Sequence, residues 1–224
     1  MTEQALSITD SSTPFDLLLD PLSPEWQKTD EMGIELSPAP LDRQPSAYIQ
    51  KSWSERRFGL VNQIFVRAIH NRNNLAVHLR WRCDHASRRI SDINVYADAC
   101  AIMFPLDSVL TDMIQPQTMG SPEFPVGLWY WRAGVDQTYS ARAMGIGTVE
   151  RDHENLKARG ICADDHWQVV ISGDIQGLGR VKSLPVAFAV WAGANAERGG
   201  IKSHSPEFCN LRLPGSVSDQ VRER

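Results

Sequence analysis

The chain has 224 residues, of which 42% are hydrophobic and 22% charged, a composition typical of packed globular proteins and not of disordered or fibrous ones. This length suits one sizeable domain, with or without an extra arm, better than two independent domains. The net charge of −4 leaves no broad basic surface for phosphate groups, which argues against a nucleic-acid partner.

The absence of targeting segments and the spacing of the cysteines exclude further classes of protein. No segment approaches the roughly 20 apolar residues of a membrane-spanning helix, and the first residues, MTEQALSITDSS, lack the basic and apolar regions of a signal peptide. The cysteines are widely spaced, without a CxxC pair or CxxCH, which argues against zinc ribbons, iron–sulfur clusters and covalent haem. We interpret all four as buried apolar thiols: Cys83, Cys100, Cys162 and Cys209.

Residues 1–58 are rich in Pro, Ser, Asp and Glu, and their prolines interrupt any strand ladder. We predict a long, irregular, extended arm. Because it contains Trp26 and Trp53, it is too apolar for a solvated tail, and we expect it to lie along the domain or a partner subunit. The domain itself is predicted over residues 59–216, followed by a tail at 217–224.

An alternation of period two begins after residue 59. Leu75, Val77 and Trp81 fall on one face of a predicted strand, and His78 and Arg80 fall on the other. The Asn-rich segment 70–74 predicts a hairpin turn before it, and a charged segment, 149–158, predicts a short helix. The pattern predicts an antiparallel β-sandwich with few helices, and its strands are expected at 62–69, 75–83, 93–104, 126–133, 167–172, 186–191 and 208–213.

Motifs of the common enzyme classes are absent: the sequence has no GxSxG, Walker loop, GxGxxG or HExxH. The six histidines form no metal-spaced pair. The residues themselves therefore do not indicate catalysis.

Two segments combine glycines with potential metal donors. In AFAVWAGANAERGGIKSHS, the glycines close to Lys202 permit a ligand to approach the backbone. In QTMGSPEFPVGLWYWRA, Met119 precedes a turn rich in Gly and Pro and then a strand with Trp129 and Trp131. Composition alone favours ordinary roles for both residues, Met119 as a loop or core methionine and Lys202 as a solvated surface lysine.

Several ordered blocks, YADACAIMFP, PVGLWYWRA, HWQVVISGDI and VAFAVWAGANAERGGIKSHSPEF, resemble the haem b-binding γ subunits of the ethylbenzene dehydrogenase type. The resemblance covers roughly Val61 to Leu213 and leaves the arm uncovered. It implies a β-sandwich similar to carbohydrate-binding modules, and an electron-transfer role without catalysis of its own. Related complexes include dimethyl sulfide dehydrogenase, selenate reductase and chlorate reductase.

The resemblance also implies one haem b whose iron is bound by Met119 and Lys202. Met103 is the competing methionine, although it has no adjacent glycine, and His204 is the competing base. A lysine binds iron only as the free amine, which burial favours, and a thioether stabilises Fe(II). Trp129, Trp131 and Trp191 either wall the haem pocket or belong to the sandwich core, and the sequence does not decide between these readings.

The implied partners are a molybdenum-containing catalytic α subunit, an iron–sulfur β subunit and a soluble c-type cytochrome or similar acceptor, so this chain is expected to hold neither molybdenum nor an iron–sulfur cluster. The heterotrimer is expected in the periplasm, exported on a partner's twin-arginine signal, with the cytoplasm as the alternative. Two alternative functions are a haem-free sugar-binding module, with Trp129 and Trp131 as exposed stacking platforms, and a structural γ-like subunit that has lost its haem.

Overall fold

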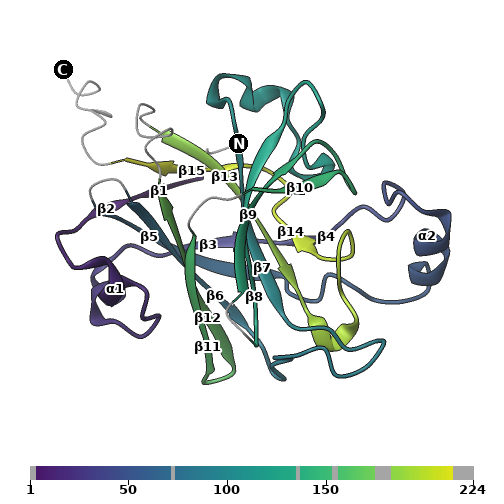
Figure 1. Ribbon diagram of the computed structural model, residues 1–224, viewed down its shortest axis with the longest axis horizontal. Helices are drawn as coiled ribbons and strands as arrows, with labels where there is room; N and C mark the ends of the chain where they lie inside the picture. The colour runs from purple at the N-terminus through teal and green to yellow at the C-terminus, as the bar shows by residue number, and fades with distance from the viewer. Residues whose placement is uncertain (1–3, 72–73, 135–136, 153–155, 175–182, 214–224) are drawn as a thin grey trace, which may run out of the picture.

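The computed structural model describes the chain except for residues 1–3, 72–73, 135–136, 153–155, 175–182 and 214–224. Two β-sheets pack face to face and confirm the predicted β-sandwich (Figure 1). Within the described ranges, no helix is both long and apolar enough to cross a bilayer. The predicted tail at 217–224 lies outside the described residues.

The first sheet has six strands, and its long strands pair antiparallel. The predicted hairpin joins two of them, which pair up to Asn71 and Asn74. Their order is β11 (Lys157–Ala163), β12 (His166–Asp174), β6 (Asn74–Arg82), β5 (Gln63–Asn71) and β2 (Thr9–Asp10), with β3 (Met32–Glu35) also paired to β5.

The second sheet has nine strands and carries the site described below. Its central strands β13, β7, β8 and β9 are antiparallel neighbours. The path runs β1 (Ala5–Ser7), β15 (Cys209–Arg212), β13 (Ser183–Trp191), β7 (Ala99–Pro105), β8 (Val126–Arg132), β9 (Gln137–Ala143) and β10 (Val149–Arg151), while β14 (Ser203–His204) joins β13 to β4 (Ser37–Pro38).

The core between the sheets is rich in tryptophan. Trp81 and Trp167 from the six-stranded sheet contact Trp131 from the other sheet, with ring centroids 6.5 and 5.2 Å from Trp131. Trp129 packs edge-on against Phe104, 5.7 Å away. Because Trp129 and Trp131 are only 2% and 0% exposed, they are core residues, and neither can serve as an exposed platform for a sugar.

The first 58 residues form short elements that pair with both sheets instead of a separate layer. Four strands of this segment, β1 to β4, pair with β15, β5 and β14. Figure 1 shows α1 and α2 at opposite ends of the molecule. The helical turns of this segment are α1 (Phe15–Leu18), η1 (Pro24–Lys28) and α2 (Ala47–Trp53).

The α1–η1 segment covers the outer face of the six-stranded sheet. Leu18 and Trp26 form a buried cluster with Ile69, Ala76 and Val170, whose side chains face away from the main core. The indole N–H of Trp26 donates to the carbonyls of Leu18 and Asp20, both 3.1 Å away. The face of β6 that the sequence pattern predicted to be exposed is therefore partly buried by the arm.

His78 lies under this cover, 5.2 Å from the Trp26 ring, and burial, with a smaller effect of Arg67, lowers its pKa to about 4. An unfolded histidine titrates near 6.5, so the neutral side chain contributes stability that is complete above that pH and is lost as the pH falls toward 4. We expect His78 to account for a loss of about 3 kcal/mol over this window.

Urea unfolding of the wild type and of His78→Gln at pH 7.5 and pH 4.5 measures this contribution. The variant is expected to lose distinctly less stability on acidification, because Gln does not titrate. An equal loss in both proteins would show that His78 is not buried in its neutral form.

Two parts of the predicted secondary structure differ from the structure. The described residues of the segment 149–158 do not form the predicted helix, because β10 and the first residues of β11 lie there. Strands β9 and β11 were not predicted. Short 3₁₀ turns complete the described elements, namely η2 (Ser108–Met113), η3 (Pro116–Thr118) and η4 (Gly193–Asn195).

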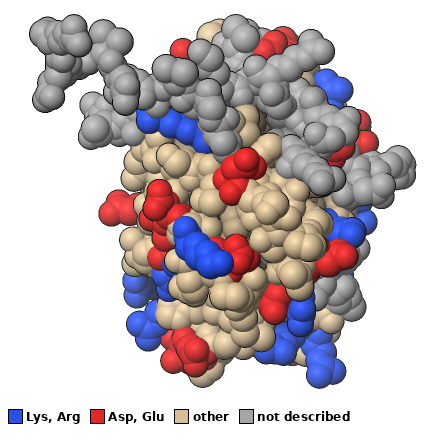
Figure 2. All heavy atoms as spheres, turned by 90° about the vertical axis from the view of Figure 1, so that its left-hand side faces the viewer, with Lys and Arg blue, Asp and Glu red and all other residues tan. Residues whose placement is uncertain are grey.

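The surface around α1 and β2 carries both signs of charge. On that face, Figure 2 shows blue and red side chains interspersed among uncharged ones. Several opposite charges pair directly there, for example Lys28 with Glu25 at 2.6 Å and Arg80 with Glu31 at 2.9 Å. A mixed surface of this kind offers no continuous basic path for a phosphate backbone.

Candidate functional site

A cavity of about 450 Å³ lies on the outer face of the nine-stranded sheet, the face directed away from the tryptophan core. Its floor consists of side chains from the central strands β13, β7 and β8. Its walls come from loops that are distant in sequence, including residues 44–49, 90–97, 116–119, 146–149 and 197–204. The volume lies in the range of cofactor and drug-sized ligand sites.

Strand register arranges the floor in three rows. Side chains of alternate residues point to the same face of a sheet, so the cavity side of β13, β7 and β8 bears every second residue. The rows are Ala187, Met103 and Leu128, then Ala189, Ala101 and Tyr130, then Trp191, Ala99 and Arg132. Four alanines make much of this floor flat, as a planar ligand requires.

The TMGS turn places Met119 at one wall. Met119 ends the short η3 turn in the left-handed conformation, with φ of 56°, and its N–H donates to the Pro116 carbonyl at 3.2 Å. Gly120 follows with φ of 78°, and a Cβ there would lie 2.7 Å from the Phe124 carbonyl oxygen. The glycine is therefore required for the turn that aims Met119 into the cavity.

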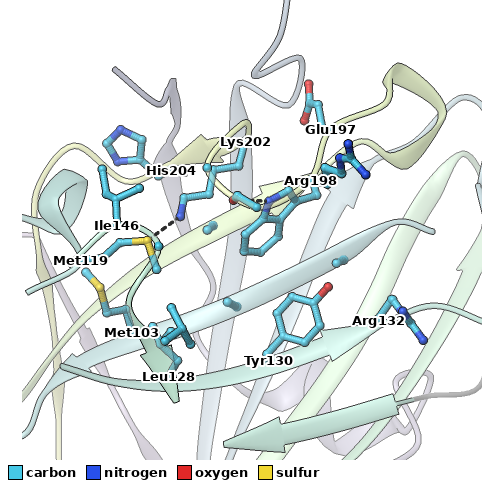
Figure 3. Close-up of a pocket in the computed structure, with 18 of the residues that line it drawn as sticks. Met103, Met119, Leu128, Tyr130, Arg132, Ile146, Glu197, Arg198, Lys202 and His204 are labelled. Atoms are coloured by element: carbon cyan, nitrogen blue, oxygen red, sulfur yellow. Dashed lines mark hydrogen bonds between the residues drawn. The ribbon is translucent and has the colours of Figure 1, made fainter. Parts of the chain in front are cut away.

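Lys202 reaches the same point from the GGIKS segment, which leads into β14. Its carbonyl accepts from Ala39 N–H at 2.9 Å, so the arm helps to fix its backbone. The side chain is 7% exposed, and its Nζ donates to Met119 Sδ at 3.1 Å (Figure 3). Burial lowers the pKa of Lys202 to about 8, which brings the neutral amine within reach near physiological pH.

Both competing residues also line the cavity. Met103 lies on the floor in β7, 7% exposed. His204 has its Nδ1 2.7 Å from the Ser205 carbonyl oxygen, and its ring points away from the Met119–Lys202 contact (Figure 3). Burial lowers the pKa of His204. Of these four side chains, Met119 and Lys202 make the direct contact.

The three tryptophans of the sequence prediction divide between the two faces of the sheet. Trp191 walls the cavity: its ring lies 5.6 Å from Tyr130, and Lys202 Nζ lies 5.3 Å from its centroid. Its indole N–H donates to the Gly199 carbonyl at 3.0 Å, which ties the glycine loop to β13. Trp129 and Trp131 face the core.

Several lining residues were missed by the sequence analysis. Tyr130 and Arg132 alternate with Trp129 and Trp131 on β8, so the period-two pattern of that strand contained the signal that could have found them. Gln44, from the arm, closes one side by donating through Nε2 to the Pro40 and Gly200 carbonyls, both 3.2 Å away. No sequence signal marks that contact.

The residues present fit a haem. A thioether and a buried amine with a lowered pKa are both donors that haem iron accepts in proteins, and here they meet inside a cavity with an alanine-rich floor. The glycines at 199 and 200 leave part of the wall without side chains.

In a comparison with known families, the model described as "Ethylbenzene dehydrogenase" matches residues 23–145. The match includes Met119 and ends before Lys202. It also begins within the first 58 residues, so the expectation that the arm lies outside the resemblance is wrong.

Three curated relatives were found. The chain is 28% identical over 159 residues to the chlorate reductase subunit gamma of Ideonella dechloratans, covering 67% of this chain and 65% of that protein. It is 31% identical over 153 residues to a putative respiratory nitrate reductase heme subunit of Haloferax mediterranei, covering 65% and 54%. It is 28% identical over 208 residues to the dimethylsulfide dehydrogenase subunit gamma of Rhodovulum sulfidophilum, covering 87% and 75%.

The first two matches thus span about two thirds and about half of the lengths of those relatives.

The solved structures that resemble this chain share its fold alone. A putative carbohydrate-binding protein from Bacteroides uniformis has a TM-score of 0.51 at 9% identity, covering 95% of this chain and 100% of that one. A family 9 carbohydrate-binding module from Caldicellulosiruptor kristjanssonii has a TM-score of 0.51 at 11% identity, covering 98% and 100%.

Proposed function

Because this chain belongs to the ethylbenzene dehydrogenase family, we propose that it binds one haem b in the cavity and serves as a non-catalytic electron-transfer γ subunit of an oxidoreductase complex. The observation that carries the proposal is the contact between Met119 Sδ and Lys202 Nζ, 3.1 Å apart in a largely apolar cavity. The relatives named as a heme subunit and as gamma subunits support the same role.

Met119 and Lys202 would hold the haem through its iron, and the bound haem would supply a one-electron redox couple. Lys202 offers its neutral amine because burial disfavours the ammonium form. Met119 offers a soft thioether, which favours the reduced iron. An iron that takes both of its remaining ligands from the protein would suit electron transfer and not substrate chemistry.

The complex proposed around this chain contains a molybdenum catalytic α subunit and an iron–sulfur β subunit, with a soluble c-type cytochrome or similar protein as the external partner. Support comes from the family membership and from relatives named as subunits of chlorate reductase and dimethylsulfide dehydrogenase. We propose a periplasmic location, with export on a partner's twin-arginine signal. Fractionation of native cells tests the location, and co-purification tests the partners.

Haem content tests the proposal most simply. The full chain, purified from cells able to make haem, is expected to show a low-spin b-type spectrum that changes on dithionite reduction, with one haem per chain by the pyridine haemochrome assay. A preparation without haem that also fails to take up added haem would contradict it. In that case glycan binding would be the next activity to measure.

A further inference from the structure

We propose that Arg132 and Arg198 form the binding subsite for the two propionate carboxylates of the haem, so that the cavity holds the group in one orientation. The inference rests on the proposed function and deepens it. Both arginines line the cavity, and Figure 3 shows them at the end away from Met119 and Met103. Neither residue emerged from the sequence analysis as a site residue.

The floor of the cavity is polarised along its length. Its first row, Ala187, Met103 and Leu128, carries only apolar side chains, and its last row contains Arg132 beside Ala99 on the neighbouring strand. The first and last rows are four residues apart along β13, from Ala187 to Trp191, which is about 13 Å in an extended strand. Ile146 adds to the apolar end (Figure 3). A ligand with one apolar and one anionic edge matches this gradient.

The balance of charge in the cavity favours an anion. Among the described lining residues, the side chains that stay positively charged at and above neutral pH are Arg132 and Arg198, and the one acidic side chain is Glu197. Glu197 is 1% exposed, and its carboxylate accepts from the backbone N–H groups of Gly59 at 2.8 Å and Ala192 at 2.9 Å. The charge of Glu197 is therefore already engaged by backbone N–H groups behind the loop.

The guanidinium of Arg198 is held at the rim in a way that suits carboxylate binding. Its Cζ lies 4.6 Å from the centroid of the Tyr96 ring, and Tyr96 donates from its hydroxyl to the Ile93 carbonyl at 2.7 Å. A guanidinium that contacts a ring through its face keeps its in-plane N–H donors available for other partners. A planar fork of this kind pairs with carboxylates in a bidentate manner.

Arg132 supplies the second cation from the floor. It follows the core residue Trp131 on β8, so strand alternation turns its side chain to the cavity face. It is half-buried, which strengthens a charge-assisted hydrogen bond relative to one in open water. Two arginines, one from a loop and one from a strand, thus line the same end of the cavity.

The test compares haem b with its dimethyl ester, which keeps the iron and ring but lacks the carboxylate charges. Binding of each to the full-length chain is followed by absorption for the wild type and for Arg132→Gln/Arg198→Gln. The matched control is Arg142→Gln/Arg159→Gln, which removes the same charge from two exposed arginines that do not line the cavity.

We expect the Arg132→Gln/Arg198→Gln variant to bind haem b about 10- to 100-fold more weakly than the wild type, from the strength of charge-assisted hydrogen bonds. Its affinity for the ester is expected to equal that of the wild type, and the control is expected to bind both as the wild type does. Equal losses for haem and ester would indicate a structural role and overturn the inference. Unchanged haem affinity would overturn it as well, while leaving the proposed function intact. A wild type that binds neither compound would overturn both.

Discussion

Replacing Lys202 by methionine is expected to change the b-type spectrum, because the substitution removes the side-chain amine whose Nζ lies 3.1 Å from Met119 Sδ. The spectrum should change in both oxidation states, since the thioether introduced at position 202 is a different donor from an amine. The control is Lys157→Met, which removes an exposed lysine whose partner is Asp16 at 3.4 Å. Retention of the wild-type spectrum in Lys202→Met would move the assignment to His204.

The same substitution should leave the stability of the haem-free chain unchanged or raise it, by up to about 3 kcal/mol in urea unfolding. The reason is that Lys202 is buried without an acidic partner in the described structure, and replacing a buried cation by an apolar side chain of similar length removes a desolvation cost. If Lys202 stabilised the haem-free fold through its own contacts, its replacement would lower the free energy of unfolding. A large destabilisation without haem would therefore contradict a ligand role.

Trp131→Ala is expected to lower the free energy of unfolding by about 3–5 kcal/mol, as for other buried large-to-small substitutions. Trp131 is fully buried between the sheets and packs so closely on β11 that a Cβ at Gly160 would lie 2.2 Å from its ring. At temperatures where the variant remains folded, its haem spectrum should be that of the wild type, because Trp131 faces the core and not the cavity.

Tyr48→Ala is the matched control for Trp131→Ala, since it removes an aromatic ring that is 81% exposed. Its effect should fall within about 0.5 kcal/mol. Urea unfolding and absorption spectra of both variants check these expectations. If Trp131→Ala costs less than 1 kcal/mol or changes the haem spectrum, then Trp131 has been assigned to the wrong face.

The sequence indicated the sandwich because its long central strands alternate so regularly. Leu75, Val77, Leu79 and Trp81 all enter the core, as the pattern of β6 predicted. Edge strands were harder to predict from the sequence. Strand β11 is half-exposed and begins with a lysine, and charged side chains on an edge strand commonly prevent strand pairing between molecules. A charged, weakly alternating segment such as 149–158 therefore resembles a surface helix in sequence alone.

The arm was the least predictable part of the fold. Its strands are short, β2 and β4 having two residues each, so no period can be recognised. Their pairing depends on strands far along the chain, such as β14 for β4. Local sequence carries no information on such long-range contacts, although the apolar Trp26 and Trp53 did indicate that the arm is not solvated.

For the site, sequence and structure contributed different parts. Met119 and Lys202 are 83 positions apart, and only the family resemblance suggested them as a pair. The polarity of the cavity, with Arg132 at one end of the floor and Met103 at the other, depends on the register between β7 and β8. That register was not available from the order of residues, although the alternation within β8 already separated Tyr130 and Arg132 from the core tryptophans.

A crystal structure of the full-length chain with haem b bound would test the assignment of the ligands most directly. We predict haem b in the cavity on the outer face of the nine-stranded sheet, with its iron bound by Met119 Sδ and Lys202 Nζ. Iron bound by Met103 or His204, or a haem located outside this cavity, would contradict the assignment.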